Sequence, residues 1–246
     1  MIPRHKLDIS YFHLIQALAL PANQEQSDIS HFFPDSRHCF LSLSVRTCWD
    51  LILRSLNLPA DSEIIMSNIN IADMVKIARF HQLIPVPIEF NSATQEIDYN
   101  LLKTKVNSKT KIVLIAQLFG AKSNLEIFKQ IKAEYPDLLL IEDLAQSFAD
   151  GHQEHPNVDI SMYSFGTIKT LTALGGSVAL IKDHDLFLKM SSLNEQYPQI
   201  KTSTFNKKIL KTITLKLIST PLIYSLLHAI SNLFNINLDA LLSNAV

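Results

Sequence analysis

The sequence predicts an α/β fold in which a mostly parallel sheet is flanked by helices. Short apolar runs alternate with segments of helical periodicity between about residues 46 and 181. Two of these runs, 111–118 and 138–141, are hydrophobic except for Lys111 and Gln117, which is typical of strands buried on both faces. The chain has 246 residues, 47% of them hydrophobic, and can therefore bury one large core with at most an incomplete second one.

The individual elements follow from their local patterns. Residues 46–58 are predicted to form a helix that contains Trp49. The prolines of the extended run 85–88 favour the edge of a sheet, since proline donates no ladder hydrogen bond. The other expected helices are 71–81, 99–106 and 125–135, and the other expected strands are 63–66, 159–165 and 177–181.

The αβ alternation stops near residue 183, where helices follow that are rich in lysine as far as Lys216 and apolar afterwards. We therefore predict a large domain at 1–185 and a helical C-terminal segment at 186–246. The run from Leu217 to Phe234 lacks Asp, Glu, Lys and Arg, but Pro221 and several polar residues interrupt it. A spanning helix needs about 20 predominantly apolar residues, so we expect a buried or interfacial helix and no membrane span.

Composition excludes several classes of function. The net charge of −1, from 22 basic and 23 acidic residues, gives no global field for nucleic acid or an anionic membrane. Cys39 and Cys48 are too few for a disulfide framework or a zinc site. The N-terminus lacks the apolar core of an export signal, so a cytoplasmic location is expected. His152 and His155 lie in a loop pattern without further ligands, and no metal site is expected there.

Glycine is concentrated around one lysine. Three of the chain's five glycines lie within 164–176, on either side of Lys169. Glycine permits positive φ and close approach of the backbone, which favours a shaped pocket at this segment. Lys169 and Asp143 both follow expected strands, and ligands of open α/β sheets gather at the carboxyl ends of strands.

These residues suit pyridoxal phosphate. Such a site needs a lysine for the Schiff base, an acid for the pyridinium nitrogen and donors for the phosphate. Asp143 follows four apolar residues, so its charge needs a partner, and a cationic ring nitrogen would supply one. Ser164, five residues before Lys169, can donate its hydroxyl to the phosphate.

The order of the motifs resembles the DegT/DnrJ/EryC1/StrS sugar aminotransferases, a branch of fold type I pyridoxal phosphate enzymes. Glu-Asp-x-Ala-Gln at 142–146 is followed by Ser-Phe-x3-Lys at 164–169 and by Gly-Gly at 175–176. The resemblance runs from about Leu41 to Ile181. It implies that Lys169 and Asp143 are catalytic, the first as the Schiff-base lysine and the second as the partner of the pyridinium nitrogen.

The resemblance also implies the remaining cofactor contacts. Gln146 would contact the cofactor ring or its hydroxyl. The phosphate would be held by Ser164 and by a loop at a helix N-terminus, where free N–H groups attract anions. Val45 stands where the family usually has glycine, and Ile71 stands about where many members place an aromatic ring. The residues implied to bind the cofactor are Lys169, Asp143, Gln146, Ser164, Val45, Arg46 and Thr47.

The implied function is a pyridoxal 5'-phosphate-dependent transaminase that moves an amino group, commonly from glutamate, to a keto-sugar nucleotide in polysaccharide or antibiotic sugar biosynthesis. Such enzymes usually act as homodimers. Family members are longer and have a C-terminal small domain that helps to close the active site, so we expect that domain to be truncated or absent here. Two alternatives stay open: an impaired homologue acting as a cofactor-binding or partner subunit, and a fragment of a longer enzyme.

Overall fold

The computed structural model of the chain describes residues 7–19, 29, 33, 37–91, 93–94, 96–118, 120, 124–147, 155–169 and 171–233. Contacts divide the chain into two compact units. The sheet unit comprises Ile29–Phe165 and Gly176–Tyr197, and the helical unit comprises Met1–Asp28, Gly166–Gly175 and Pro198–Val246. This division differs from the predicted domain limits, because residues 1–28 and 166–175 group with the C-terminal helices.

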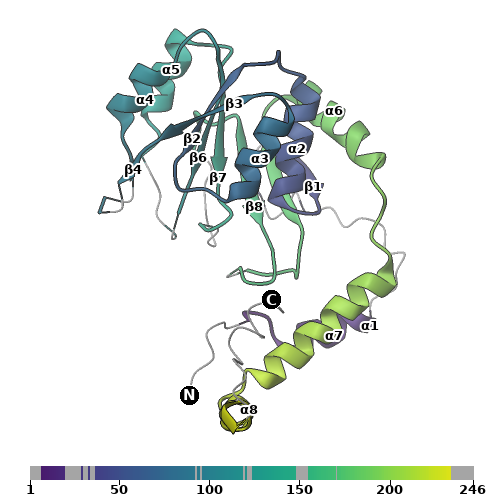
Figure 1. Cartoon of the computed structure of the whole chain (residues 1–246). Helices are drawn as coiled ribbons and strands as arrows, with labels where there is room; N and C mark the ends of the chain where they lie inside the picture. Colours follow the sequence, from purple (N-terminus) through teal and green to yellow (C-terminus); the bar gives the residue numbers. More distant parts are fainter. Residues whose placement is uncertain are drawn as a thin grey trace. The chain divides into compact units, whose positions relative to one another are not determined.

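The sheet unit contains a seven-stranded sheet with the order β1-β9-β8-β7-β6-β2-β3 (Figure 1). Strands β3, β2, β6, β7 and β8 are parallel, whereas β9 is antiparallel to both of its neighbours. The predicted α/β fold with a mostly parallel sheet is therefore confirmed. The strands are β1 (His38–Ser42), β2 (Glu63–Ser67), β3 (Ile84–Ile88), β6 (Thr110–Ala116), β7 (Leu139–Asp143), β8 (Ile160–Ser164) and β9 (Ser177–Ile181).

Helices cover both faces of this sheet. Helices α2 (Val45–Leu56), α3 (Ala72–Phe80) and α6 (His184–Glu195) pack on one face, and α4 (Tyr99–Lys105) and α5 (Ile127–Glu134) pack on the other. Successive strand residues point to opposite faces of the sheet. Ile64 and Met66 therefore belong to the hydrophobic core beneath α2, α3 and α6, which we call the first cluster, while Ile65 belongs to the core beneath α4 and α5. Trp49 is fully buried in the first cluster, and its Nε1 donates to the carbonyl oxygen of Met74 at 3.0 Å.

The predicted edge strand is confirmed at β3, which pairs only with β2. Its pairing uses the N–H of Ile84, which donates to the carbonyl oxygen of Ser62 at 2.9 Å, while Pro85 and Pro87 have no N–H. Two features of the sheet unit were not predicted: strand β1 at the opposite edge, and a small hairpin of β4 (Phe90–Asn91) and β5 (Glu96–Ile97).

The helical unit contains α1 (Tyr11–Ala19), α7 (Thr202–Ile218) and α8 (Pro221–Leu233). Leu14 of α1 packs with Ile209 of α7 and with Leu174. The ammonium of Lys216 donates to the carbonyl oxygen of Leu7 at 3.1 Å.

The expected helix over 217–234 is wrong in one respect, because the apolar run is divided between α7 and α8. Proline is well suited to the first position of a helix, and α8 begins at Pro221. Phe234 lies outside the described residues. Within the described part of the chain, no single helix has the length and hydropathy to cross a membrane, and α7 and α8 meet that criterion only together, as a pair bent by 82°.

Candidate active site

The carboxyl ends of β1, β7 and β8 meet at one edge of the sheet. Met162 pairs with Asp143, and Ser164 and Ser42 both pair with Ser177, the first residue of β9. The hydroxyls of Ser42 and Ser177 lie 2.6 Å apart. We call this edge the carboxyl rim. All of it lies within the sheet unit. It brings together the end of β1 that leads into α2, the predicted acid Asp143 and the predicted phosphate-binding Ser164.

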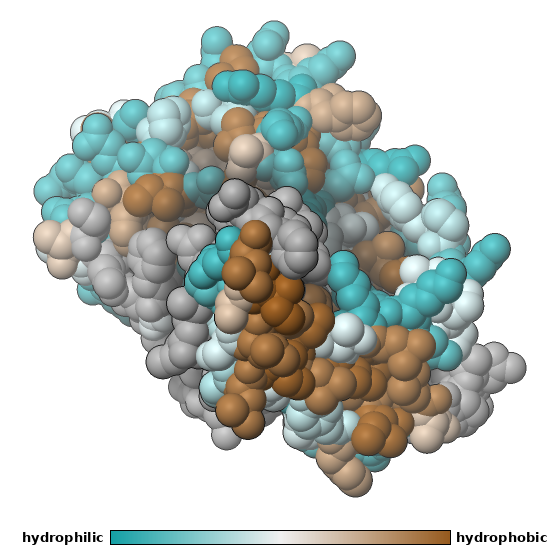
Figure 2. Space-filling view, turned by 60° about the horizontal axis from the view of Figure 1, so that its bottom comes forward, coloured by the Kyte–Doolittle hydropathy of each residue, from teal (hydrophilic) through white to brown (hydrophobic). Residues whose placement is uncertain are grey.

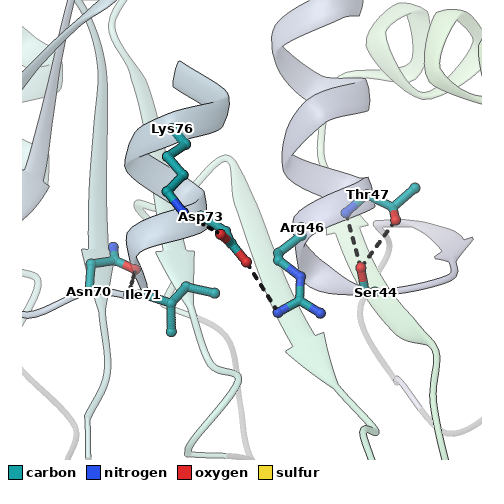
Figure 3. A network of polar contacts seen from close by, with 7 residues as sticks. All are labelled: Ser44, Arg46, Thr47, Asn70, Ile71, Asp73 and Lys76. Atoms are coloured by element: carbon teal, nitrogen blue, oxygen red, sulfur yellow. Dashed lines mark hydrogen bonds and ion pairs between the residues drawn. The ribbon is translucent and has the colours of Figure 1, made fainter. Parts of the chain in front are cut away.

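The N-terminus of α2 lies beside the carboxyl rim and is capped by a serine. Ser44 caps the helix: its Oγ accepts from the Thr47 N–H at 3.2 Å and lies 3.1 Å from Thr47 Oγ1 (Figure 3). The first amides of a helix have no partner within it, and the helix dipole favours negative charge there. Val45 is the first helical residue, and its side chain is buried in the core cluster. Its backbone is therefore helical, and no positive φ requires the glycine that is usual in the family.

Arg46 connects this helix end to the start of α3. Its Nη1 lies 3.7 Å from Asp73 Oδ2, and Lys76 Nζ lies 3.4 Å from Asp73 Oδ1 (Figure 3). All three side chains are about half exposed or more, so these ion pairs contribute little to stability. Arg46 is the second residue of α2, so its positive charge belongs to the first turn of the helix. Ile71 precedes α3 and is exposed, with its N–H donating to Asn70 Oδ1 at 2.8 Å.

Asp143 is buried at the end of β7. Its Oδ1 accepts from the N–H of Ala145 at 2.9 Å, and its carbonyl oxygen accepts from the N–H of Gln117 at 2.9 Å. Burial raises the pKa of the Cys48 thiol in α2 to about 12, with the negative charge of Asp143 adding to the rise and a hydrogen bond with Ser42 opposing it. The carboxylate therefore lies within electrostatic reach of the N-terminal half of α2, and Cys48 stays a protonated, inert thiol.

The neighbours of Asp143 differ in exposure. Gln146 is exposed, three residues after the acid, and Ser164 is half-buried at the end of β8. Glu142 is buried and accepts from Ser161 Oγ at 2.7 Å, while Arg37 Nη1 donates to the same Ser161 oxygen at 3.1 Å. Glu142 thus belongs to a structural network on the other face of the strand, as its alternation with Asp143 requires.

Lys169 lies in the helical unit, on the segment Gly166–Gly175 that leaves and rejoins the sheet between β8 and β9. The base of the segment is closed, because the N–H of Phe165 donates to the carbonyl oxygen of Gly176 at 3.1 Å. Gly176 has a φ of +88°, a conformation that favours glycine. The N–H of Lys169 donates to the carbonyl oxygen of Gly166 at 3.0 Å, and its side chain is half-buried. The carboxyl rim therefore unites the predicted site residues of the sheet unit only.

Sequence reasoning missed three polar residues of this region. Ser42 was missed because β1 was not predicted, and Ser177 follows the Gly-Gly pair directly, which is the signal that could have found it. Asp73 could have been found from its position in the first turn of α3. His155 contacts Glu126, with Nε2 3.3 Å from Oε1, whereas His152 lies outside the described residues.

Comparisons with known proteins agree with this architecture. The DegT/DnrJ/EryC1/StrS aminotransferase family matches residues 31–213. The chain is 27% identical over 151 residues to the erythromycin biosynthesis sensory transduction protein EryC1 of Saccharopolyspora erythraea, covering 60% of this chain and 41% of that protein. It is 32% identical over 98 residues to the dTDP-3-amino-3,6-dideoxy-α-D-galactopyranose transaminase of Aneurinibacillus thermoaerophilus, covering 39% of this chain and 26% of that protein.

A solved structure shows the same fold. Helicobacter pylori PseC, an aminotransferase involved in the biosynthesis of pseudoaminic acid, superposes with a TM-score of 0.65 at 18% identity, over 82% of this chain and 57% of that one. The chain therefore spans well under two thirds of the length of these relatives. The family match covers most of the chain and includes the whole carboxyl rim. The chain belongs to the DegT/DnrJ/EryC1/StrS aminotransferase family.

Proposed function

We propose that this chain binds pyridoxal 5'-phosphate and transfers an amino group, with glutamate as the donor, to a keto-sugar nucleotide. The observation that carries the proposal is the carboxyl rim, where a capped helix N-terminus, a buried carboxylate and the hydroxyl of Ser164 meet at one edge of the sheet. The named transaminase relative, whose name includes a dTDP-linked amino sugar, supports the substrate class.

The described residues fit the cofactor. Its phosphate carries negative charge, and the first turn of α2 offers backbone donors and the guanidinium of Arg46. Asp143 is a buried carboxylate, and a buried charge is stable only when it is paired or hydrogen-bonded. A protonated ring nitrogen is a cation that a buried carboxylate can bind. When bound, pyridoxal phosphate acts as an electron sink beside the carbon that gains or loses a proton.

The chain's own residues would then have separate roles. The helix end with Ser44 and Thr47, together with Ser164, binds the phosphate. Asp143 keeps a proton on the ring nitrogen by its negative charge. Lys169 would hold the cofactor through its Nζ, and its amine would carry the proton at the reacting carbon as a general base and acid. A homodimer and a cytoplasmic location belong to the same proposal.

The test begins with the absorption spectrum of the purified chain mixed with pyridoxal phosphate. We expect a visible band that borohydride abolishes while fixing the cofactor's mass on the peptide that contains Lys169. Lys169→Ala should lack the band and the added mass, whereas the control Lys189→Ala, on the exposed surface of α6, should retain both. Asp143→Asn preserves the shape of the side chain but removes its charge, so it should bind the cofactor and lose transfer by about 10²–10⁴-fold.

The second step adds glutamate and follows the loss of the band, then adds keto-sugar nucleotides and detects the amino sugar by mass spectrometry. Absence of the band in the wild-type chain would contradict cofactor binding. A band without transfer from glutamate or to any keto sugar would instead support a homologue that binds the cofactor and acts as a partner subunit.

A further inference from the structure

Helix α8 exposes large hydrophobic side chains on one face. Leu222, Leu226 and Leu233 are 86%, 63% and 81% exposed, and their spacing places them on one face of the helix. Tyr224 and Ser231 lie on the opposite face and are buried. A helix that packs on a protein core and faces water shows the reverse arrangement. The exposed face of α8 therefore suits an apolar neighbour better than it suits water.

Helix α7 also has an exposed side, and this side carries positive charge. Its buried side contains Ile209, Thr212 and Leu215. Its exposed side follows the spacing of three and four residues that aligns neighbours along a helix. This side combines lysines with leucines, namely Lys207, Leu210, Lys211 and Leu217. This combination is typical of helices that lie in a membrane interface. The leucines enter the apolar layer, and the lysines beside them have long side chains that reach back to its polar boundary.

The distribution of charge along the chain favours an anionic neighbour. Residues 196–233 contain five lysines and no Asp, Glu or Arg. Removing these five from the 22 basic residues leaves 17 basic against 23 acidic residues, so the rest of the chain has a net charge of −6. Residues 196–233 therefore carry a net charge of +5, although the net charge of the whole chain is only −1. Positive segments beside apolar faces are attracted to anionic lipids by about 1 kcal/mol per lysine.

We propose that the exposed faces of α7 and α8 lie on the surface of a membrane that contains anionic lipids. Figure 2 shows hydrophobic side chains gathered on the face that the view brings forward. Neither helix crosses the bilayer, and the bend of 82° between them lets each follow the interface. A second copy is a poorer occupant, because a two-fold interface through this surface would set the lysines of one copy against those of the other.

The test measures sedimentation of the full chain with vesicles of phosphatidylcholine alone or with about 30% phosphatidylglycerol. The wild type should bind the anionic vesicles, bind the neutral ones much more weakly, and lose binding at about 0.5 M salt, where charges are screened. Lys207→Gln with Lys211→Gln should weaken binding by about tenfold or more. Leu222→Ser with Leu226→Ser, which removes buried apolar contact with the lipid, should weaken it by a similar factor.

Matched controls come from the sheet unit. Lys103→Gln with Lys109→Gln removes two exposed lysines, and Phe80→Ser with Leu188→Ser removes two exposed apolar side chains. Both controls should bind vesicles as the wild type does. The proposal is overturned if the wild type does not bind anionic vesicles, or if the controls weaken binding as much as the α7–α8 variants. It is also overturned if the wild type is an oligomer that ignores vesicles and Leu222→Ser with Leu226→Ser makes it monomeric, since a second copy then covers the surface.

Discussion

The sheet unit and the helical unit differ in how fully their large hydrophobic side chains are buried. In the sheet unit, both faces of the sheet are covered and a buried charge such as Glu142 is hydrogen-bonded. In the helical unit, leucines of α8 face outward while Tyr224 is buried. Burial of apolar surface is the main favourable term in folding. We therefore expect stability to be concentrated in the sheet unit, whereas the exposed side of the helical unit is adapted to what it contacts.

The largest effect should come from Trp49, which is fully buried between the helices and the sheet. Trp49→Ala removes this side chain and its hydrogen bond to Met74, and should lower the free energy of unfolding by about 3–5 kcal/mol. The measurement is denaturant unfolding followed by circular dichroism, because Trp49 is the chain's single tryptophan and the variant has no indole fluorescence.

Phe80→Ala is the matched control, since Phe80 lies on the neighbouring helix α3 and is 80% exposed. It should change the free energy of unfolding by no more than about 0.5 kcal/mol. Similar losses in both variants would show that the sheet unit does not hold the stability that its burial indicates.

A smaller effect is expected from Cys48 at alkaline pH. Burial raises its pKa from 9.0 to about 12 in the folded chain. Unfolding then releases a proton above pH 9, so the stability that the buried thiol contributes is complete below pH 9 and is lost as the pH rises towards 12. At pH 10 the loss is about 1.4 kcal/mol relative to pH 8. Cys48→Ala should reduce the fall in unfolding free energy between these two pH values by that amount.

Cys39→Ala serves as the control, because Cys39 is only partly buried in β1. It should show the same alkaline loss as the wild type. An unchanged pH dependence in Cys48→Ala would mean that the thiol is accessible to solvent in the folded chain and that the first turns of α2 pack less closely on Asp143.

The smallest effect in solution is expected for Leu222→Ser with Leu226→Ser. Because these side chains are exposed in α8, the pair should change the free energy of unfolding by about 0.5 kcal/mol or less in the absence of lipid. A loss of several kcal/mol in dilute solution would show that α8 is covered by protein, and the contrast between the two units would then disappear.

The sequence predicted most of the sheet because β6, β7 and β9 each contain an uninterrupted apolar stretch with polar residues at its boundary. It missed β1, whose five residues mix polar and apolar types and pair with a strand far along the chain. Residue order likewise predicted the candidate site residues, of which Asp143 and Ser164 lie at the carboxyl rim. The contact of Ser42 with Ser177 and the proximity of Cys48 to Asp143 depend on long-range register, which no local pattern contains.

The exposed side of α8 could not be predicted for a different reason. The helix has no charged residue, and its polar residues include the exposed Ser225 and Asn232 as well as the buried Ser231, so periodicity alone does not say which side is buried. The sequence shows the proline at which α8 begins, but it does not show the bend of 82° between α7 and α8.

The prolines of β3 have a consequence for how copies of the chain meet. Edge strands offer unpaired N–H and C=O groups to which a strand of another molecule can add. Backbone N–H groups along a strand point alternately to its two sides. The N–H of Ile84 points towards β2, so positions 85 and 87 face away from β2, and both are prolines. That side of the strand lacks the donors needed to extend the ladder. The sheet therefore ends at β3, and fibre growth or strand exchange through this edge is blocked by the covalent structure of the chain.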